Sequence, residues 1–319
     1  MALGSVPAPG PGRLGFFGGG SFSSPVPAFQ LTTNRNPGQS WPRMATKRQQ
    51  ALGAYLAFLT ANPVFSLEDL AKVAGGRDPR ARARERVKYY VETGRVRRLA
   101  RELYAAVPAG AKAGSFAPDP FLVGAALRAD AVFSHHSALE LLGAAHSDWN
   151  VCTAYTAGTP ASVRWGSHTA RLLAAPTLAL GEKWNTLGVR SVQRAGRTLR
   201  VTGPERTLVE GFRQLRWAGG LAELSESAGG FASLDLKILR DVLTAYDKRS
   251  LWAATGWFLE RHAKAFYVTP GALEEFEKHR PKARHYLPRG ARGGVFVPRW
   301  NLMLPPTLAA EGGAGEPLA

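Results

Sequence analysis

Basic side chains occupy every second position from residue 80 to residue 88, and a second basic group follows Gly94. A guanidinium can donate paired hydrogen bonds to phosphate oxygens or to guanine, so this pattern indicates a surface that binds duplex nucleic acid. The candidate contact residues are Arg80, Arg82, Arg84, Arg86, Lys88, Tyr89, Arg97, Arg98 and Arg101. We assign Arg80, Arg82 and Arg86 to the major groove, and Arg97, Arg98 and Arg101 to the DNA backbone or minor groove.

The same pattern also fits a solvated helix face, because Glu85 stands three residues from both Arg82 and Lys88 and could pair with either. The whole chain has 41 Lys and Arg residues against 24 Asp and Glu, a formal net charge of +17. This excess favours a polyanionic partner, nucleic acid before an acidic protein or membrane surface, although generally basic surfaces would also produce it.

Local signals predict the elements that would position these arginines. Ser66 is suited to cap a helix with Asp69 three residues later, and Gly75-Gly76 ends that helix. Asp78-Pro79 starts a second helix that Gly94 ends. Residues 95–107 then fit a two-stranded hairpin. This order predicts a winged helix-turn-helix over residues 44–108. Its expected core positions are Leu52, Tyr55, Leu56, Leu59, Leu67, Leu70, Ala71, Val73, Ala74, Ala83, Val87, Tyr90 and Val91.

The rest of the chain predicts a larger mixed domain, so the expected fold class is α+β. Residues 1–43 are rich in Gly, Pro, Ser and Phe and fit a disordered extension, and residues 306–319 fit a flexible tail. The larger domain spans residues 119–305 after a Gly/Ala/Pro linker. Its helices are expected at residues 120–127, 204–212, 234–246, 251–263 and 271–279. Its strands are expected at residues 132–133, 149–155, 163–165, 190–193, 198–201, 295–297 and 300–304.

Three blocks, in this order, resemble the AbiEi-type antitoxins of type IV toxin–antitoxin systems. The first is the predicted wing from Gly94 to Tyr104, in which Glu102 stands where that family usually has glycine. The second runs from Ala131 to Gly143 and contains Ser-His-His-Ser-Ala-Leu. The third runs from Val201 to Glu210 and contains Pro-Glu-Arg-Thr-Leu-Val. Residues 1–43 have no counterpart in the family.

The resemblance implies a repressor of its own operon that binds an operator with inverted repeats in double-stranded DNA. It also implies that the larger domain counteracts a nucleotidyltransferase toxin, with no stable complex required. The alternative is a DNA-binding transcriptional regulator whose C-terminal domain senses a ligand or resembles a nuclease.

Enzymatic chemistry has little support in the sequence. Cys152 is the only cysteine, which excludes an internal disulfide and a cysteine-based zinc site. His135-His136 invites a catalytic or metal role, but we expect Ser134 or Asp130 to cap a helix that begins there. Glu205 and Arg206 fit a helix start or an internal ion pair. We expect no catalytic residue, no metal, no cofactor, no membrane span and a cytoplasmic location.

A second basic cluster lies near the C-terminus. It comprises Lys278, His279, Arg280, Lys282, Arg284, His285, Arg289 and Arg292. This cluster could meet nucleic acid or an acidic protein face, or it could be a solvated loop.

Overall fold

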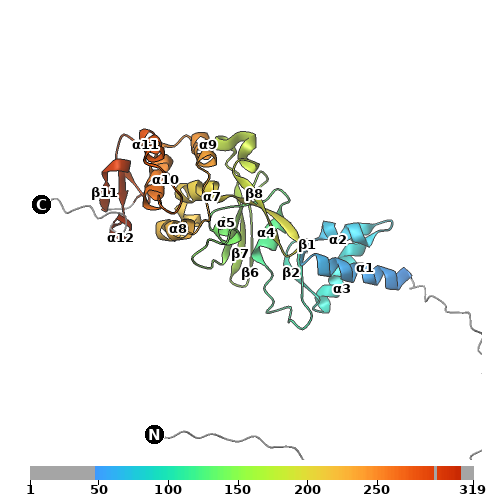
Figure 1. Ribbon diagram of the computed structural model, residues 1–319. Coiled ribbons are helices and arrows are strands. Elements are labelled where there is room, and N and C mark those ends of the chain that lie inside the picture. The colour runs from blue at the N-terminus through green and yellow to red at the C-terminus, as the bar shows by residue number, and fades with distance from the viewer. Residues whose placement is uncertain (1–46, 291–292, 310–319) are drawn as a thin grey trace, which may run out of the picture. The chain divides into compact units, whose positions relative to one another are not determined.

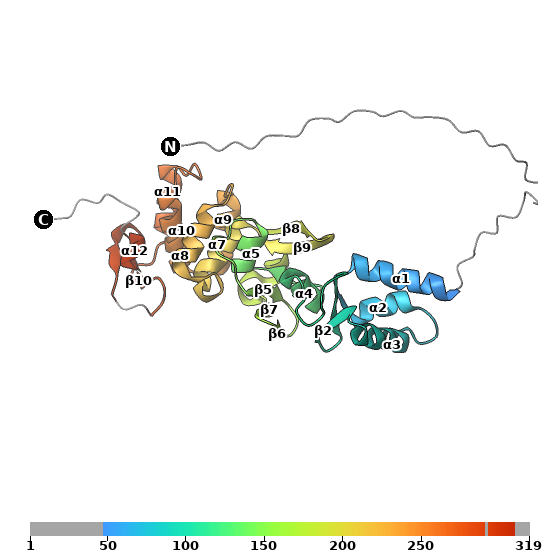
Figure 2. The same ribbon diagram turned by 90° about the horizontal axis from the view of Figure 1, so that it is seen from below.

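The structure, a computed structural model, describes residues 47–290 and 293–309, and its fold class is mixed α+β (Figures 1 and 2). The expected extension at residues 1–43 lies outside the described residues. Pro306–Ala309 form a short helix, α12, with Leu308 buried, so the expected flexible tail is wrong for these four residues. The remainder of that tail lies outside the described part.

The first part of the chain contains three helices and a small antiparallel sheet. The elements are α1 (Lys47–Ala61), β1 (Val64–Ser66), α2 (Leu67–Ala74), α3 (Pro79–Glu92), β2 (Val96–Ala100) and β3 (Leu103–Ala106). The strand order is β1-β3-β2, and both neighbouring pairs are antiparallel. Helices α2 and α3 and the hairpin of β2 and β3 follow one another as expected, whereas β1 was not expected.

Packing of this part confirms most of the expected core. Leu67, Leu70, Ala83, Val87 and Tyr90 are buried between the helices and the sheet. Four expected core positions are wrong, because each helix buries a narrower stripe than its apolar pattern suggested. Leu52, Leu56, Val73 and Val91 are between 37% and 41% exposed.

A six-stranded sheet organises the middle of the chain. Its strands are β4 (Val132–Phe133), β5 (Val151–Thr156), β6 (Ala161–Trp165), β7 (His168–Ala174), β8 (Val189–Arg194) and β9 (Arg197–Thr202). The order is β6-β7-β5-β4-β9-β8, with β5–β7 and β4–β9 parallel and the other pairs antiparallel. Successive side chains of a strand point to opposite faces. Accordingly, Phe133 packs with α4 (Pro120–Leu127), whereas Val132 joins the core formed with the later helices.

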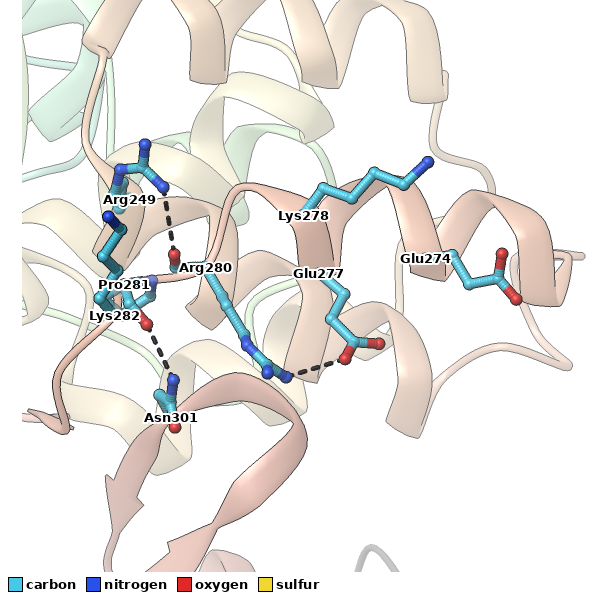
Figure 3. A pocket seen from close by; sticks show the side chains of 8 residues that line it. All are labelled: Arg249, Glu274, Glu277, Lys278, Arg280, Pro281, Lys282 and Asn301. Carbon is cyan, nitrogen blue, oxygen red and sulfur yellow. Dashed lines mark hydrogen bonds and ion pairs between the residues drawn. The ribbon is translucent and has the colours of Figure 1, made fainter.

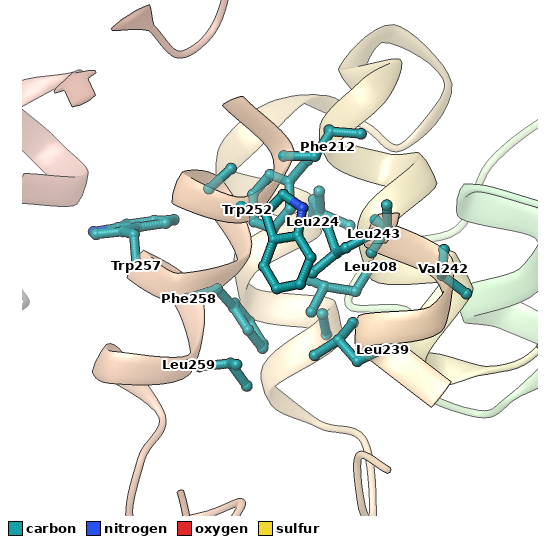
Figure 4. Close-up of a cluster of buried hydrophobic side chains, with 14 of the residues drawn as sticks. Leu208, Phe212, Leu224, Leu239, Val242, Leu243, Trp252, Trp257, Phe258 and Leu259 are labelled. Carbon is teal, nitrogen blue, oxygen red and sulfur yellow. The ribbon is translucent and has the colours of Figure 1, made fainter. Parts of the chain in front are cut away.

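Helices that lie between or after the strands of this sheet form the largest core. They are α5 (His136–Leu141), α6 (Thr177–Leu180), α7 (Pro204–Arg213), α8 (Gly220–Gly229), α9 (Leu236–Tyr246), α10 (Arg249–Arg261) and α11 (Pro270–Lys278), with the 3-10 helices η1 (Gly181–Asn185), η2 (Leu215–Trp217) and η3 (Pro298–Trp300). Figure 4 shows Leu208 and Phe212 of α7 among Leu243 of α9 and Phe258 of α10. A small sheet of β10 (His285–Tyr286), β12 (Leu302–Leu304) and β11 (Val295–Val297) follows.

The sequence located most of these elements correctly. Every strand and helix expected between residues 119 and 305 is present, with ends within two residues of the expected ones. The sequence missed the short elements α6 and β10. It also missed β7 and α8, since the β7 segment lacks a regular polar–apolar alternation and the α8 segment begins with Gly219-Gly220. In the part of the chain that the structure describes, no helix is both long and apolar enough to cross a bilayer. The cytoplasmic location stays a prediction.

Candidate nucleic-acid interface

Helix α3 is oriented by its cap and its buried stripe. The Asp78 side chain accepts a hydrogen bond from the Ala81 N–H at 2.9 Å, and Pro79 occupies the first turn, where no N–H partner is needed. Ala83, Val87 and Tyr90 lie on the buried side of the helix. Helical geometry therefore directs Arg82, Arg84 and Lys88 away from the core.

Arg82 lies over the turn between α2 and α3. Gly75 and Gly76 in this turn have positive φ angles of 58° and 85°, a region that favours glycine. A Cβ atom at Gly76 would lie 2.4 Å from Nη1 of Arg82, so the absence of a side chain there lets the guanidinium approach the backbone. Arg82 remains exposed and has no carboxylate partner within the described residues.

Glu102 joins α3 to the hairpin turn. Its φ of 57° is in the left-handed region, which glycine adopts more easily than other residues. Its carboxylate accepts hydrogen bonds from Arg80 at 2.9 and 2.8 Å, and Arg84 lies 3.5 Å away. Its carbonyl accepts a hydrogen bond from the Leu67 N–H at 2.9 Å. In the sequence alone, Glu102 stands out only because it occupies the position where AbiEi-type antitoxins usually have glycine.

Arg86 faces α1 rather than solvent. Its guanidinium carbon lies 4.8 Å from the Tyr55 ring centroid and 5.8 Å from that of Tyr90, within the range of a cation–π contact. The residue is half-buried. The assignment of Arg86 to the major groove stays a prediction, and the aromatic rings of α1 and α3 hold its side chain in this conformation.

Two of the three hairpin arginines make backbone contacts. Arg97 donates to the Phe116 carbonyl, and Arg98 Nε donates to the Ala100 carbonyl at 3.3 Å. Arg98 and Arg101 are nevertheless exposed. Arg97 therefore holds the segment after the hairpin in place, whereas Arg98 and Arg101 remain accessible.

The eight basic candidates thus divide into two groups. Arg80, Arg84, Arg86 and Arg97 are held by carboxylate, aromatic or carbonyl partners. Arg82, Lys88, Arg98 and Arg101 are exposed and have no acidic partner among residues 47–290 and 293–309, although Arg98 donates to the Ala100 carbonyl. Tyr89 is 50% exposed beside Lys88. The solvated-face alternative is not favoured here, because neither Arg82 nor Lys88 pairs with Glu85 within the described residues.

The other two sequence blocks meet inside the protein. Strands β4 and β9 are parallel neighbours, so the residues that follow them emerge at the same sheet edge. The expectation that Ser134 or Asp130 caps the next helix is wrong. His135 occupies the N-cap position of α5 with φ 57°, and Asp130 instead accepts hydrogen bonds from the Thr156 hydroxyl and the Ala157 N–H.

His135 is fully buried. Its Nδ1 lies 3.0 Å from the Ser134 hydroxyl, and its Nε2 lies 3.4 Å from the Tyr155 hydroxyl. Burial lowers the pKa of His135 to about 4, because the charged imidazolium is poorly solvated there, and the nearby Glu210 carboxylate only partly opposes this. The ring is therefore neutral at pH 7 and belongs to a buried polar cluster with Ser134 and Tyr155.

His136 is also buried, and its ring stacks on Trp149 with centroids 4.7 Å apart. Its Nδ1 lies 2.9 Å from the Glu140 carboxylate and its Nε2 lies 3.2 Å from the Glu223 carboxylate. Both ring nitrogens are thus engaged. Across the described residues, no three His, Cys, Asp or Glu side chains are grouped so as to hold a metal ion.

Arg206 and Glu210 form a fully buried ion pair at 2.6 Å on successive turns of α7. Arg206 also donates to the carbonyls of Trp184 and Leu187 at 2.6 and 2.9 Å, and the Tyr246 hydroxyl donates to Glu210 at 2.8 Å. Glu205, which was also expected at a helix start or in an internal ion pair, forms an ion pair with Arg190 at 3.2 Å. It also accepts a hydrogen bond from the Asp235 N–H. These contacts support the expected helix start and internal ion pair.

The C-terminal basic cluster is not one surface. Arg280 donates to Glu277 at 2.8 Å and lies in a pocket with Glu274, as Figure 3 shows. Arg284 lies over the Phe296 ring at 4.6 Å. His285 and Arg289 line a different cavity, and Arg292 lies outside the described residues. Acidic neighbours therefore offset the positive charge around Arg280, but not around His285 and Arg289.

Comparisons with known proteins bear on the fold. No protein-family model and no curated protein matches the chain. Among solved structures, the chain is similar to the crystal structure of the RV2827C protein from Mycobacterium tuberculosis, with a TM-score of 0.52 and 18% sequence identity. The match covers 83% of this chain and 95% of that chain. At this identity the likeness concerns the fold alone.

Proposed function

We propose that residues 47–107 form a winged helix-turn-helix that binds double-stranded DNA. In this proposal α3 enters the major groove and the β2–β3 hairpin contacts the backbone or the minor groove. The order of elements, α1-β1-α2-α3-β2-β3, supports this assignment. The exposed arginines supply the bidentate donors that guanine and phosphate groups accept.

The observation that carries the proposal is the group of unpaired cations on α3 and at the hairpin turn. Arg82 and Lys88 lie on α3, and Arg101 is next to Glu102 in the turn. The bond between Glu102 and Arg80 holds this turn beside the first turn of α3. Helix α3 and the hairpin turn therefore expose several cations that have no carboxylate partner within the described residues.

We further propose that the protein is an antitoxin and autorepressor rather than an enzyme. The three sequence blocks that resemble AbiEi-type antitoxins support this. The second and third blocks build the buried cluster around His135 and Arg206, consistent with a structural rather than catalytic use of these residues. The functional partner would be a nucleotidyltransferase toxin, with no stable complex required.

The DNA-binding proposal is tested by fluorescence anisotropy with the DNA upstream of the protein's own gene. Arg82→Ala should weaken specific binding by about 1–3 kcal/mol if Arg82 contacts a base, and Lys88→Ala should weaken specific and non-specific binding alike. Lys237→Ala removes an exposed lysine from α9 and is the matched control. Affinity that is insensitive to salt and to both α3 variants contradicts the proposal.

The antitoxin proposal needs a separate experiment, since DNA binding does not depend on it. Co-expression with the product of the neighbouring nucleotidyltransferase gene should restore growth. The Arg82→Ala variant should restore growth as well as the unchanged protein when both are expressed from a foreign promoter. Failure of the unchanged protein to restore growth would refute the antitoxin role and leave DNA binding intact.

A further inference from the structure

A cavity of about 410 Å³ lies beside the end of α7 and the start of α10. Three separate chain segments line it: residues 212–216, residues 248–254 and residues 285–289. This volume falls within the range of about 300–1,000 Å³ that is usual for small-molecule sites. The cavity belongs to neither the DNA-binding surface nor the buried cluster around Arg206.

The charge of the cavity lining is entirely positive. Arg213, Arg216, Lys248 and Arg289 line it, and none of its thirteen lining residues is acidic. Arg216, Lys248 and Arg289 are exposed and form no ion pair with any described residue. The neighbouring pocket in Figure 3 differs, since Glu274 and Glu277 lie among its cations. Like charges that converge on a concave site without a counter-ion favour an anionic ligand.

Arg213 is held in place from the protein side. Its guanidinium lies 5.2 Å from the Tyr246 ring centroid, and its Nη2 donates to the Tyr155 hydroxyl at 3.4 Å. Among the residues that the structure describes, its buried Nε has no hydrogen-bond partner. A buried donor without a partner is unusual, and a ligand that accepts a hydrogen bond would satisfy it.

The remaining lining gives the cavity an apolar wall and further donors. Phe212, Leu251 and Leu287 provide apolar surface that could accommodate a planar ring. Ser250 and Leu251 belong to the first turn of α10, where no side chain caps the helix. The Leu251 N–H donates to the Lys248 carbonyl at 2.9 Å, so the helix dipole, rather than a free Leu251 donor, adds partial positive charge at this wall.

We propose that this cavity binds a nucleotide, with its phosphate groups on Arg216, Lys248 and Arg289 and its ring against the apolar wall. Arg213 donates to the same ligand from the inner side. The site is independent of DNA binding, because its residues lie on α7, η2, α10 and the segment before β11 rather than on α3 or the hairpin.

Isothermal titration calorimetry of the full chain with ATP tests the proposal. The double variant Arg216→Ala/Lys248→Ala should weaken ATP binding at least ten-fold. The control Lys237→Ala/Lys264→Ala, which removes two exposed lysines elsewhere, should leave the affinity unchanged. Arg82→Ala/Lys88→Ala should also leave it unchanged, whereas loss of binding in that variant would place the nucleotide on α3 and overturn the proposal.

Two further ligands test how the cavity is used. Adenosine should bind at least ten-fold more weakly than ATP, since it lacks the phosphates, and inorganic tripolyphosphate should also bind more weakly, since it lacks the ring. Equal affinity for ATP and tripolyphosphate would overturn the role of the apolar wall. Absence of ATP binding at millimolar concentration would overturn the site itself. Thermal unfolding of each variant confirms that it is folded.

Discussion

The Glu102 carboxylate at the hairpin turn accepts hydrogen bonds from a single nitrogen of Arg80, at 2.9 and 2.8 Å, and so ties the start of α3 to the hairpin. These hydrogen bonds hold the pKa of Glu102 below its usual value, although its burial acts in the opposite direction. Glu102 is thus charged at neutral pH and keeps two arginines, Arg80 and Arg84, from acting as free cations.

Replacement of Glu102 by glutamine should therefore raise DNA affinity. The change frees Arg80 and Arg84, and each additional phosphate contact should steepen the slope of log affinity against log salt by roughly 0.9. Anisotropy titrations at several salt concentrations measure this slope. Glu92→Gln changes the net charge equally at an exposed site of α3 without an ion pair among the described residues, and should not alter the slope to the same extent. A slope that does not change in Glu102→Gln would argue against Arg80 and Arg84 reaching phosphates.

The buried His135 should make the protein less stable in mild acid. Its pKa is about 4 in the folded state and about 6.5 when exposed, so the unfolded chain binds the proton more readily between these values. The contribution of neutral His135 to the free energy of unfolding is therefore complete above pH 6.5. It is lost as the pH falls toward 4, by about 3 kcal/mol in total. Urea unfolding at a series of pH values measures this loss.

The matched variant for this experiment is His135→Gln, which keeps a polar group without the titration. Burial also lowers the pKa of His262 and His285, so the difference between the two proteins isolates His135. The variant should have a flatter pH dependence of stability. Identical profiles for both proteins would mean that His135 is solvated in the folded state.

Loss of Arg206 should be among the most destabilising single changes in the chain. Arg206→Ala would leave the Glu210 carboxylate buried without its cation and two carbonyls without their donor. Breaking a buried ion pair in this way costs about 3–5 kcal/mol. Urea unfolding at pH 7 measures this loss of stability. Lys72→Ala is the control, because it breaks an exposed ion pair with Asp69 and should change the stability little. A small loss in Arg206→Ala would show that water reaches Glu210.

Close packing makes Gly256 intolerant of a side chain. A Cβ atom there would lie 2.2 Å from the Trp300 ring, so Gly256→Ala should destabilise the fold by about 1–3 kcal/mol. Gly53→Ala, on α1 with nothing within 4 Å of the new Cβ, should instead stabilise by about 0.5–1 kcal/mol. Thermal or urea unfolding of the two variants should therefore give opposite signs, and the same sign for both would contradict this packing argument.

Local signals in the sequence determined where most elements begin. Ser66 with Asp69 and Asp78 with Pro79 cap helices in the structure as expected, and Asp119 caps α4 in the same way. Such caps depend on side chains and N–H groups only two or three residues apart, so the sequence alone is sufficient to predict them. The apolar stripe of α3 was predictable for the same reason, apart from Val91.

Only the tertiary structure decided which basic side chains are free. Arg86 is held by Tyr55, which lies on another helix, and Arg80 by Glu102, which is 22 residues away. The strand order β6-β7-β5-β4-β9-β8 and the cavity lined by Arg213, Lys248 and Arg289 likewise join segments that are distant along the chain. Composition and periodicity show which charges a helix carries, but the partner of each charge depends on packing between elements, which no local pattern encodes.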